Sequence, residues 1–205
     1  YPVFPSNEPY EFKFDLIENK TVKNQIETKP ILSYLFFEGD RIIIDEMSPK
    51  EKFGKFMNNE TKLRSQSMGK SLVSYVLGHA ICEGYIESVD SKISDWNLVK
   101  DTLYENHSLI DILNMASGDQ KYVYDSAAIL KGKVSADYRG SGADIDPVAV
   151  QANLNFYFRN KLPSKKKYNY NVMNTNLILN YVLFKTGDEF QKILDKTFKE
   201  KAKIK

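Results

Sequence analysis

The sequence contains little cysteine and little histidine. Its 205 residues include one Cys and two His. The single Cys82 cannot form an internal disulfide bond, and two histidines with one cysteine do not supply the ligand cluster that a metal site needs. We therefore expect no metal site and no cofactor. Cys82 follows Lys70 in an apolar run, which predicts a buried and unreactive thiol.

The sequence also lacks a strong excess of charge and a long apolar run. Its net charge is +2, which gives no reason to expect nucleic acid as a partner. No apolar segment is long enough to span a bilayer, and no secretory signal is recognisable. Because the chain begins at Tyr1 rather than Met, we expect that an upstream segment has been removed. The sequence leaves open whether the protein is exported, periplasmic or cytoplasmic.

The composition is that of an ordinary globular protein, with 42% hydrophobic and 27% charged residues. A chain of 205 residues can bury a substantial core in one large domain, with or without a small subdomain.

The first 61 residues predict an extended arm followed by a few strands. Residues 1–9 contain three prolines and predict the arm. Residues 10–17 alternate aromatic and charged side chains, which predicts a short strand. Two runs rich in β-branched and aromatic residues within 31–46 flank Glu38-Gly39-Asp40, which predicts a hairpin with Gly39 in its turn. Residues 48–61 are polar and predict a connecting loop.

Ser67 and Lys70 lie three residues apart, directly before the apolar run 72–82. This run predicts a buried helix that ends near Gly84, a residue suited to a helix C-cap. Three residues are slightly less than one helical turn, so the hydroxyl and the amine share one face. A Ser-Lys acyl-transfer centre needs this arrangement, although an isolated S-x-x-K pattern is common on surface helices.

The remainder of the chain predicts mainly helices. Ser108 has capping-box spacing to Asp111 and predicts a helix that stops by Gly118. Residues 119–146 lack periodicity and predict a long loop. Three further helices are predicted, over 147–162, over 175–184 with Asn174 as its cap and Gly187 at its end, and over 189–198.

The order of these segments resembles a known superfamily. A hairpin precedes the S-x-x-K helix, then comes a capped Leu-Ile-Asp-Ile-Leu-Asn-Met-Ala-Ser-Gly segment at 109–118, and later a Tyr motif opens a helix that ends in Thr-Gly. This is similar to the serine β-lactamase and penicillin-binding-protein superfamily. The closest resemblance is to its class C-like branch of bacterial 6-aminohexanoate-dimer hydrolases and family VIII esterases, over roughly residue 32 to the end.

The resemblance assigns three catalytic residues. Ser67 corresponds to the acylated nucleophile and Lys70 to its amine partner. Tyr168 and Tyr170 compete for the family's catalytic tyrosine, and Tyr170 keeps the family's spacing to the following leucine-rich helix. Val172 stands where many relatives have a hydrogen-bonding Ser or Asn, which favours an esterase or amide hydrolase over a β-lactamase.

Lys185-Thr186-Gly187 matches the K-T-G form of the superfamily's third motif, but it lies only fifteen positions after Tyr170. In the family that motif lies on a strand much farther downstream. Gly187 therefore predicts a helix C-cap instead.

The resemblance implies an α/β (α+β) protein with a β-lactamase-like fold. It is expected to form one domain over 1–205, with an arm and sheet strands at 1–60 and a mainly helical region carrying the site at 61–205. Relatives continue into further strands, so we expect a C-terminal part to be missing, and association with that part or with a second copy of the chain is left open.

The implied function is a serine hydrolase that cleaves an ester or amide bond of a small molecule through an acyl-enzyme on Ser67. The alternatives are a non-catalytic penicillin-binding-like protein that holds a ligand, and a true β-lactamase or peptidase.

Overall fold

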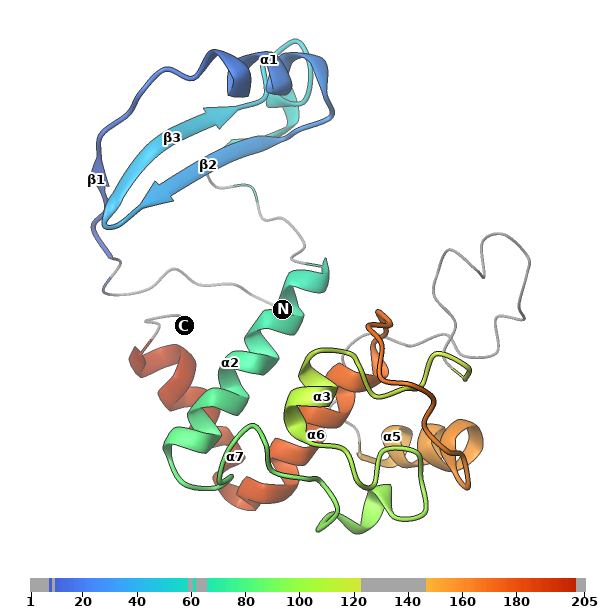
Figure 1. Ribbon diagram of the computed structural model, residues 1–205. Helices are drawn as coiled ribbons and strands as arrows, with labels where there is room; N and C mark the ends of the chain where they lie inside the picture. Colours follow the sequence, from blue (N-terminus) through green and yellow to red (C-terminus); the bar gives the residue numbers. More distant parts are fainter. Residues whose placement is uncertain (1–7, 9, 59–60, 62–65, 123–146, 202–205) are drawn as a thin grey trace. The chain divides into compact units, whose positions relative to one another are not determined.

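The chain divides into two compact units, Tyr1–Ser65 and Gln66–Lys205. The computed structural model describes residues 8, 10–58, 61, 66–122 and 147–201 (Figure 1). The arm was expected at 1–9, and of these residues only residue 8 is described. The loop was expected at 119–146, and its residues 123–146 lie outside the described residues.

The first unit is built on a three-stranded sheet. Its strands are β1 (Lys13–Phe14), β2 (Ser33–Glu38) and β3 (Arg41–Met47), in the order β1-β3-β2. β2 and β3 form the predicted antiparallel hairpin, which is confirmed, and Gly39 in its turn has a φ of 62° that favours glycine. The strand predicted over 10–17 is present only as the two residues of β1, which pair in parallel with β3.

A helix that the sequence analysis missed covers this sheet. α1 (Lys20–Thr28) begins at Asn19, whose side chain accepts a hydrogen bond from the Val22 N–H at 3.1 Å. α1 packs against β2 and β3 (Figure 1). Its Ile26 is buried, and so are Ile42, Ile43 and Ile44 of β3. The buried apolar side chains of this unit therefore come from α1 and β3.

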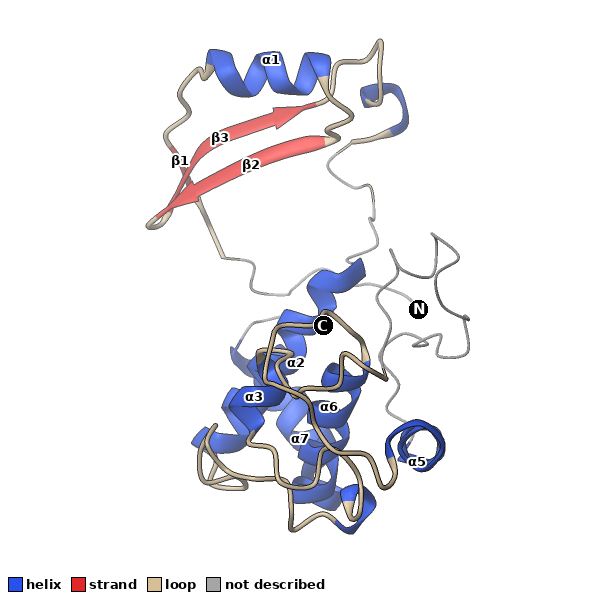
Figure 2. Cartoon of the chain, turned by 45° about the vertical axis from the view of Figure 1, so that its right-hand side comes forward, coloured by secondary structure: helices blue, strands red, loops and turns tan. Residues whose placement is uncertain are grey.

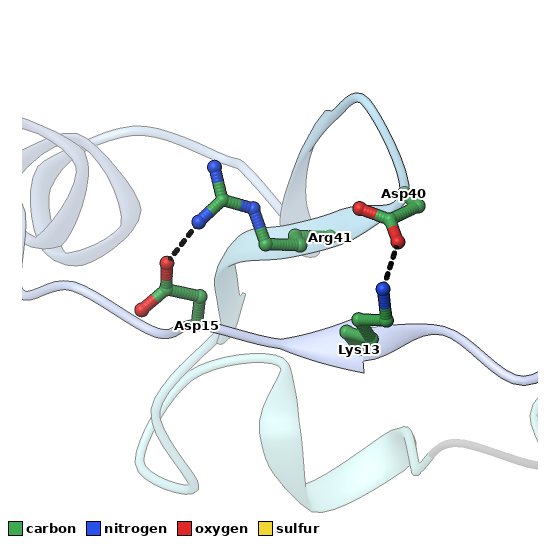
Figure 3. A network of polar contacts seen from close by, with 4 residues as sticks. All are labelled: Lys13, Asp15, Asp40 and Arg41. Carbon is green, nitrogen blue, oxygen red and sulfur yellow. Dashed lines mark hydrogen bonds and ion pairs between the residues drawn. The ribbon is translucent and has the colours of Figure 1, made fainter.

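Two ion pairs join β1 and its extension to the start of β3 (Figure 3). Lys13 Nζ lies 2.5 Å from Asp40 Oδ2, and the Arg41 guanidinium lies 2.6 Å from Asp15 Oδ2. All four side chains are largely exposed, so each pair contributes at most about 1 kcal/mol. A shift of β1 along β3 would bring side chains of like charge together, so the two ion pairs favour the observed register of these strands.

The second unit is a helical assembly (Figure 2). Its α-helices are α2 (Gly69–Cys82), α3 (Leu109–Leu113), α5 (Pro147–Asn153), α6 (Met173–Thr186) and α7 (Phe190–Leu194). A 3₁₀ turn, Gln66–Met68, precedes α2, and π-helical segments continue α5 over Leu154–Phe158 and α7 over Asp195–Lys201. The helices predicted after Lys70, after Ser108 and within 147–162 and 189–198 are all present.

α6 lies at the centre of this unit. Residues 173–182 are buried on every side of the helix, and α2, α3 and α7 pack against it. Helices that are apolar or small on all faces are typical of such central positions. The packing of α2 on α6 fixes the direction of the helix that follows Ser67.

Two sequence expectations in this unit are wrong in detail. α6 begins at Met173, so Asn174 lies inside its first turn rather than at the cap, and the Asn171 side chain instead accepts a hydrogen bond from the Asn174 N–H at 3.0 Å. Cys82 is exposed at the end of α2 rather than buried, because the buried face of α2 consists of Val73, Val76, Leu77 and Ala80. Gly187, with a φ of 52°, ends α6 as expected.

The described part of the chain is therefore α+β, with its strands in the first unit and its long helices in the second. None of the helices in these residues has the length and apolarity needed to cross a membrane.

Candidate active site

Ser67 and Lys70 meet at the N-terminal end of α2. Ser67 lies in the 3₁₀ turn Gln66–Met68, and Lys70 is the second residue of the helix. Lys70 Nζ donates a hydrogen bond of 3.4 Å to Ser67 Oγ. Ser67 is exposed, so a molecule in solution can reach it. Lys70 is half-buried in the first turn of α2.

Tyr170 comes to this pair from the segment that precedes α6. Lys70 Nζ lies 5.0 Å from the centre of the Tyr170 ring, within the range of a cation–π contact. Hydrogen bonds from Ser67 and from Lys70 lower the pKa of the Tyr170 phenol, because both stabilise the phenolate. The structure thus brings together all three residues that the sequence analysis selected.

Tyr168, the competing tyrosine, is two-thirds exposed and makes no contact with Ser67 or Lys70 among the described interactions. Val172 occupies the N-cap position of α6 and provides no side-chain hydrogen bond there. Of the two tyrosines, only Tyr170 is therefore placed to exchange a proton with Ser67.

The segment carrying Tyr170 is fastened to the turn that follows α3. The Asn169 N–H donates to the Met115 carbonyl at 2.8 Å, and the Ser164 N–H donates to the Gly118 carbonyl at 2.8 Å. Lys166 forms an ion pair with Asp111 of α3. Backbone and side-chain contacts therefore hold residues 164–169 against residues 111–118.

The two segments approach so closely at Gly118 that a side chain has no room. A Cβ built on Gly118 would lie 2.4 Å from the Ser164 carbonyl oxygen, and the φ of Gly118 is +72°. Both facts favour glycine at this position.

A buried cluster of polar side chains lies beneath the Tyr170 segment, and the sequence analysis missed it. Its centre is Asp119, which has no exposed surface. The Tyr104 hydroxyl and the amides of Asn169, Asn171 and Asn174 donate hydrogen bonds to its carboxylate. Three asparagines within six residues are a sequence signal for side-chain hydrogen bonding, but nothing in the pattern identifies a partner fifty residues upstream.

A narrow crevice of about 200 Å³ opens beside Lys70, between α2, α3 and α6. Its walls are mainly apolar and include Val73, Ile112, Leu113, Met115 and Ile178. A larger hollow of about 610 Å³, lined by residues of 101–111 and 160–166, contains none of Ser67, Lys70 or Tyr170. The polar contacts among those three residues, rather than the volume of a hollow, identify the candidate site.

The two histidines lie apart from the candidate site. His79 packs edge-on against Tyr75 on the last turns of α2, with 4.7 Å between ring centres. His107 is a buried residue of the loop before α3, and burial lowers its pKa against the opposing effects of Asp111 and the Ser117 carbonyl. Lys185 pairs with Asp95 near the end of α6 and takes no part in the site.

Within the described ranges, no group of three or more His, Cys, Asp and Glu side chains is arranged to hold a metal ion. Neither a protein-family model nor a curated protein sequence matches the chain.

Proposed function

We propose that this chain is a serine hydrolase that cleaves an ester or amide bond of a small molecule through an acyl-enzyme on Ser67. The observation that carries the proposal is the three-way contact among Ser67, Lys70 and Tyr170. Lys70 Nζ donates to Ser67 Oγ at 3.4 Å and lies 5.0 Å from the centre of the Tyr170 ring, and the interaction of the phenol with Ser67 and Lys70 lowers its pKa. A nucleophilic hydroxyl next to a proton acceptor, with a cation beside both, is the arrangement that acyl transfer requires.

In the first step, Ser67 Oγ attacks the carbonyl carbon of the substrate while its proton passes to the oxygen of the Tyr170 phenolate. Collapse of the tetrahedral intermediate breaks the bond to the leaving alcohol or amine, which takes this proton from Tyr170. In the second step, water attacks the acyl-enzyme, Tyr170 accepts a proton from the water, and Ser67 recovers its proton as the acid product departs. Atoms and charges balance over the cycle.

The lowered pKa of Tyr170 supports its role as the base. A phenol of ordinary pKa, about 10, is ionised only to a small extent near neutral pH. Hydrogen bonds from Ser67 and Lys70 increase the ionised fraction. In this mechanism the Lys70 amine stabilises the phenolate by hydrogen bonding, while its contact with Ser67 orients the nucleophile.

The position of Ser67 in the turn that leads into the fourteen-residue helix α2 also favours the reaction. The N-terminus of a helix carries a partial positive charge, which typically stabilises a nearby negative charge by about 0.3–1 kcal/mol. The first N–H groups of α2 have no side-chain cap. In our proposal, this positive end of the helix stabilises the oxyanion that develops near Ser67.

We further propose that the chain has a β-lactamase-like fold of the class C-like branch. Four features support this relationship: the hairpin before the site helix, the Ser-Lys pair at its start, the Ser-Gly turn after α3, and the tyrosine before α6. Val172 offers no polar group to a substrate amide, which favours an esterase or amide hydrolase.

Covalent labelling with a fluorophosphonate probe tests the proposal. We expect one label per chain, located at Ser67 by peptide mass mapping, and loss of labelling in Ser67→Ala. Ser71→Ala, in the first turn of α2, is the matched control and is expected to retain labelling. Tyr170→Phe is expected to slow acylation by about 10²–10⁴-fold, the usual contribution of a general acid–base group.

The pH dependence provides a second readout. Because Tyr170 acts in its ionised form, the acylation rate of the wild type should rise with pH through an apparent pKa below the ordinary tyrosine value, and Tyr170→Phe should lose this rise. If the wild type shows no labelling at any probe concentration, the chain is not a serine hydrolase, and a ligand-holding protein without turnover becomes the better description.

A further inference from the structure

The carboxylate of Asp119 is fully buried and lies directly beneath the segment that carries Tyr170. Its Oδ2 accepts hydrogen bonds from Tyr104 at 2.8 Å and from the Asn171 amide at 3.1 Å, and its Oδ1 accepts from the Asn169 amide at 3.3 Å. A buried charge is tolerated only when it is paired with several donors, so this cluster has a strongly preferred geometry.

Asn169 and Asn171 are the residues on either side of Tyr170, and they bind different oxygens of the same carboxylate. Both flanking amides point inward to Asp119, whereas the Tyr170 ring between them points outward. It is 43% exposed and reaches Lys70.

Further hydrogen bonds hold the Asp119 carboxylate in place. Tyr104, which donates to it, has no exposed surface, and Asn174 donates from the first turn of α6 at 3.4 Å. The Ser117 hydroxyl in turn donates to Asn174 Oδ1 at 2.9 Å. Asp119 therefore ties the Tyr170 segment to the central helix and to the turn after α3.

We propose that Asp119 is a positioning residue, which holds the Tyr170 phenol within hydrogen-bonding reach of Ser67 and Lys70 by anchoring Asn169 and Asn171. The inference deepens the proposed hydrolase function and rests on it. Asp119 does not touch the reacting atoms in this assignment, and it acts only through Tyr170.

Asp119→Asn is the direct test, because it preserves side-chain size while one acceptor oxygen becomes an NH₂ group that faces other donors. We expect the second-order rate of fluorophosphonate acylation to fall by about 10–100-fold, since a misplacement of ~1 Å can cost about 10²-fold. The pH profile should also shift to higher pH, because a phenol released from Ser67 and Lys70 regains its ordinary pKa.

A double-mutant cycle separates positioning from a purely structural role. If Asp119 acts through Tyr170, then Asp119→Asn should slow acylation by less than about threefold when Tyr170→Phe is already present. The matched control is Asp95→Asn. It makes the same change in a partly buried carboxylate that accepts a hydrogen bond from a tyrosine, Tyr181 at 2.9 Å, but near the C-terminal end of α6. It should leave the acylation rate and its pH profile unchanged.

Each outcome is decisive. An unlabelled wild type overturns the proposed function itself, and this inference with it. Two results overturn the positioning role alone when the wild type is labelled. One is that Asp119→Asn slows acylation equally in the wild type and in Tyr170→Phe. The other is that it slows acylation in neither. If the fluorescence of Trp96 shows that Asp119→Asn does not fold, Asn169→Ala replaces it in the cycle with the same expectations, because it removes one donor and leaves the carboxylate in place.

Discussion

Gly118→Ala tests whether the close contact between the turn after α3 and the Tyr170 segment is rigid. The Gly118 carbonyl accepts hydrogen bonds from both the N–H and the hydroxyl of Ser164, each at 2.8 Å. An added Cβ would lie 2.4 Å from the Ser164 carbonyl oxygen, 3.0 Å from its nitrogen and 3.2 Å from Pro163 Cβ. Two of these three neighbours are backbone atoms, so the strain cannot be relieved by a side-chain rotation.

The expected cost has two parts. The φ of +72° disfavours any residue with a Cβ, by roughly 1–2 kcal/mol. Forcing an extra methyl group into a filled space costs typically about 1–3 kcal/mol more. We therefore expect Gly118→Ala to lower the free energy of unfolding of the second unit by about 2–5 kcal/mol.

Urea unfolding followed by Trp96 fluorescence measures this cost. Trp96 is the only tryptophan, and it is buried within the second unit, so its signal reports on that unit. Gly84→Ala is the matched control, because Gly84 has a φ of +81° with no atom within 4 Å of an added Cβ. It should show only the conformational cost, about 1–2 kcal/mol.

The difference between the two variants isolates the close approach. Because the shifted Ser164 lies in the segment that leads to Tyr170, Gly118→Ala should also slow fluorophosphonate labelling, whereas Gly84→Ala should not. If the two variants have the same free energy of unfolding, the backbone at Ser164 moves away from the added methyl group without loss of stability. The turn after α3 then does not hold the Tyr170 segment rigidly.

Substitutions of His107 and of Leu77, the latter with a control at Leu72, probe the second unit with the same fluorescence assay. Because burial keeps the pKa of His107 below its unfolded value of about 6.5, its contribution to stability is fully present above pH 6.5 and is lost as the pH falls through the lower folded-state pKa. His107→Gln should therefore weaken the loss of unfolding free energy between pH 7 and pH 5, and an unchanged slope would contradict the assignment. Leu77→Ala, at a side chain only 1% exposed where α2 packs on α6, should cost about 2–5 kcal/mol, whereas Leu72→Ala, 49% exposed on the same helix, should cost less than about 1 kcal/mol.

The elements that could be predicted from the sequence are those whose signals are local. The hairpin follows from two β-rich runs around Gly39, and α3 follows from Ser108, whose hydroxyl accepts from the Asp111 N–H at 3.4 Å and donates to the Asp111 carboxylate at 2.9 Å. The Ser67–Lys70 contact is local too, since helical spacing alone brings the two side chains together.

The elements that the sequence analysis missed depend on tertiary contacts. α1 contains few apolar residues and is stabilised mainly by packing its buried Ile26 on the sheet. Cys82 lies in an apolar run, but the run is longer than the face of α2 that becomes buried, and only packing against α6 decides which residues are covered. Asp119 and Asn171 are separated by 52 positions, so no periodicity connects them.

The same distinction applies to the three residues of the candidate site. Ser67 and Lys70 keep their spacing wherever α2 lies, but Tyr170 is one hundred residues away and meets them only through long-range contacts. Those contacts run through the Met115 carbonyl, the Gly118 carbonyl and the Asp119 carboxylate, all within five residues of the chain. Substitutions in this short turn should therefore impair acylation more than their distance from Ser67 suggests. The proposed nucleophile, Ser67, would remain accessible before α2, but the proposed proton acceptor, Tyr170, would be displaced.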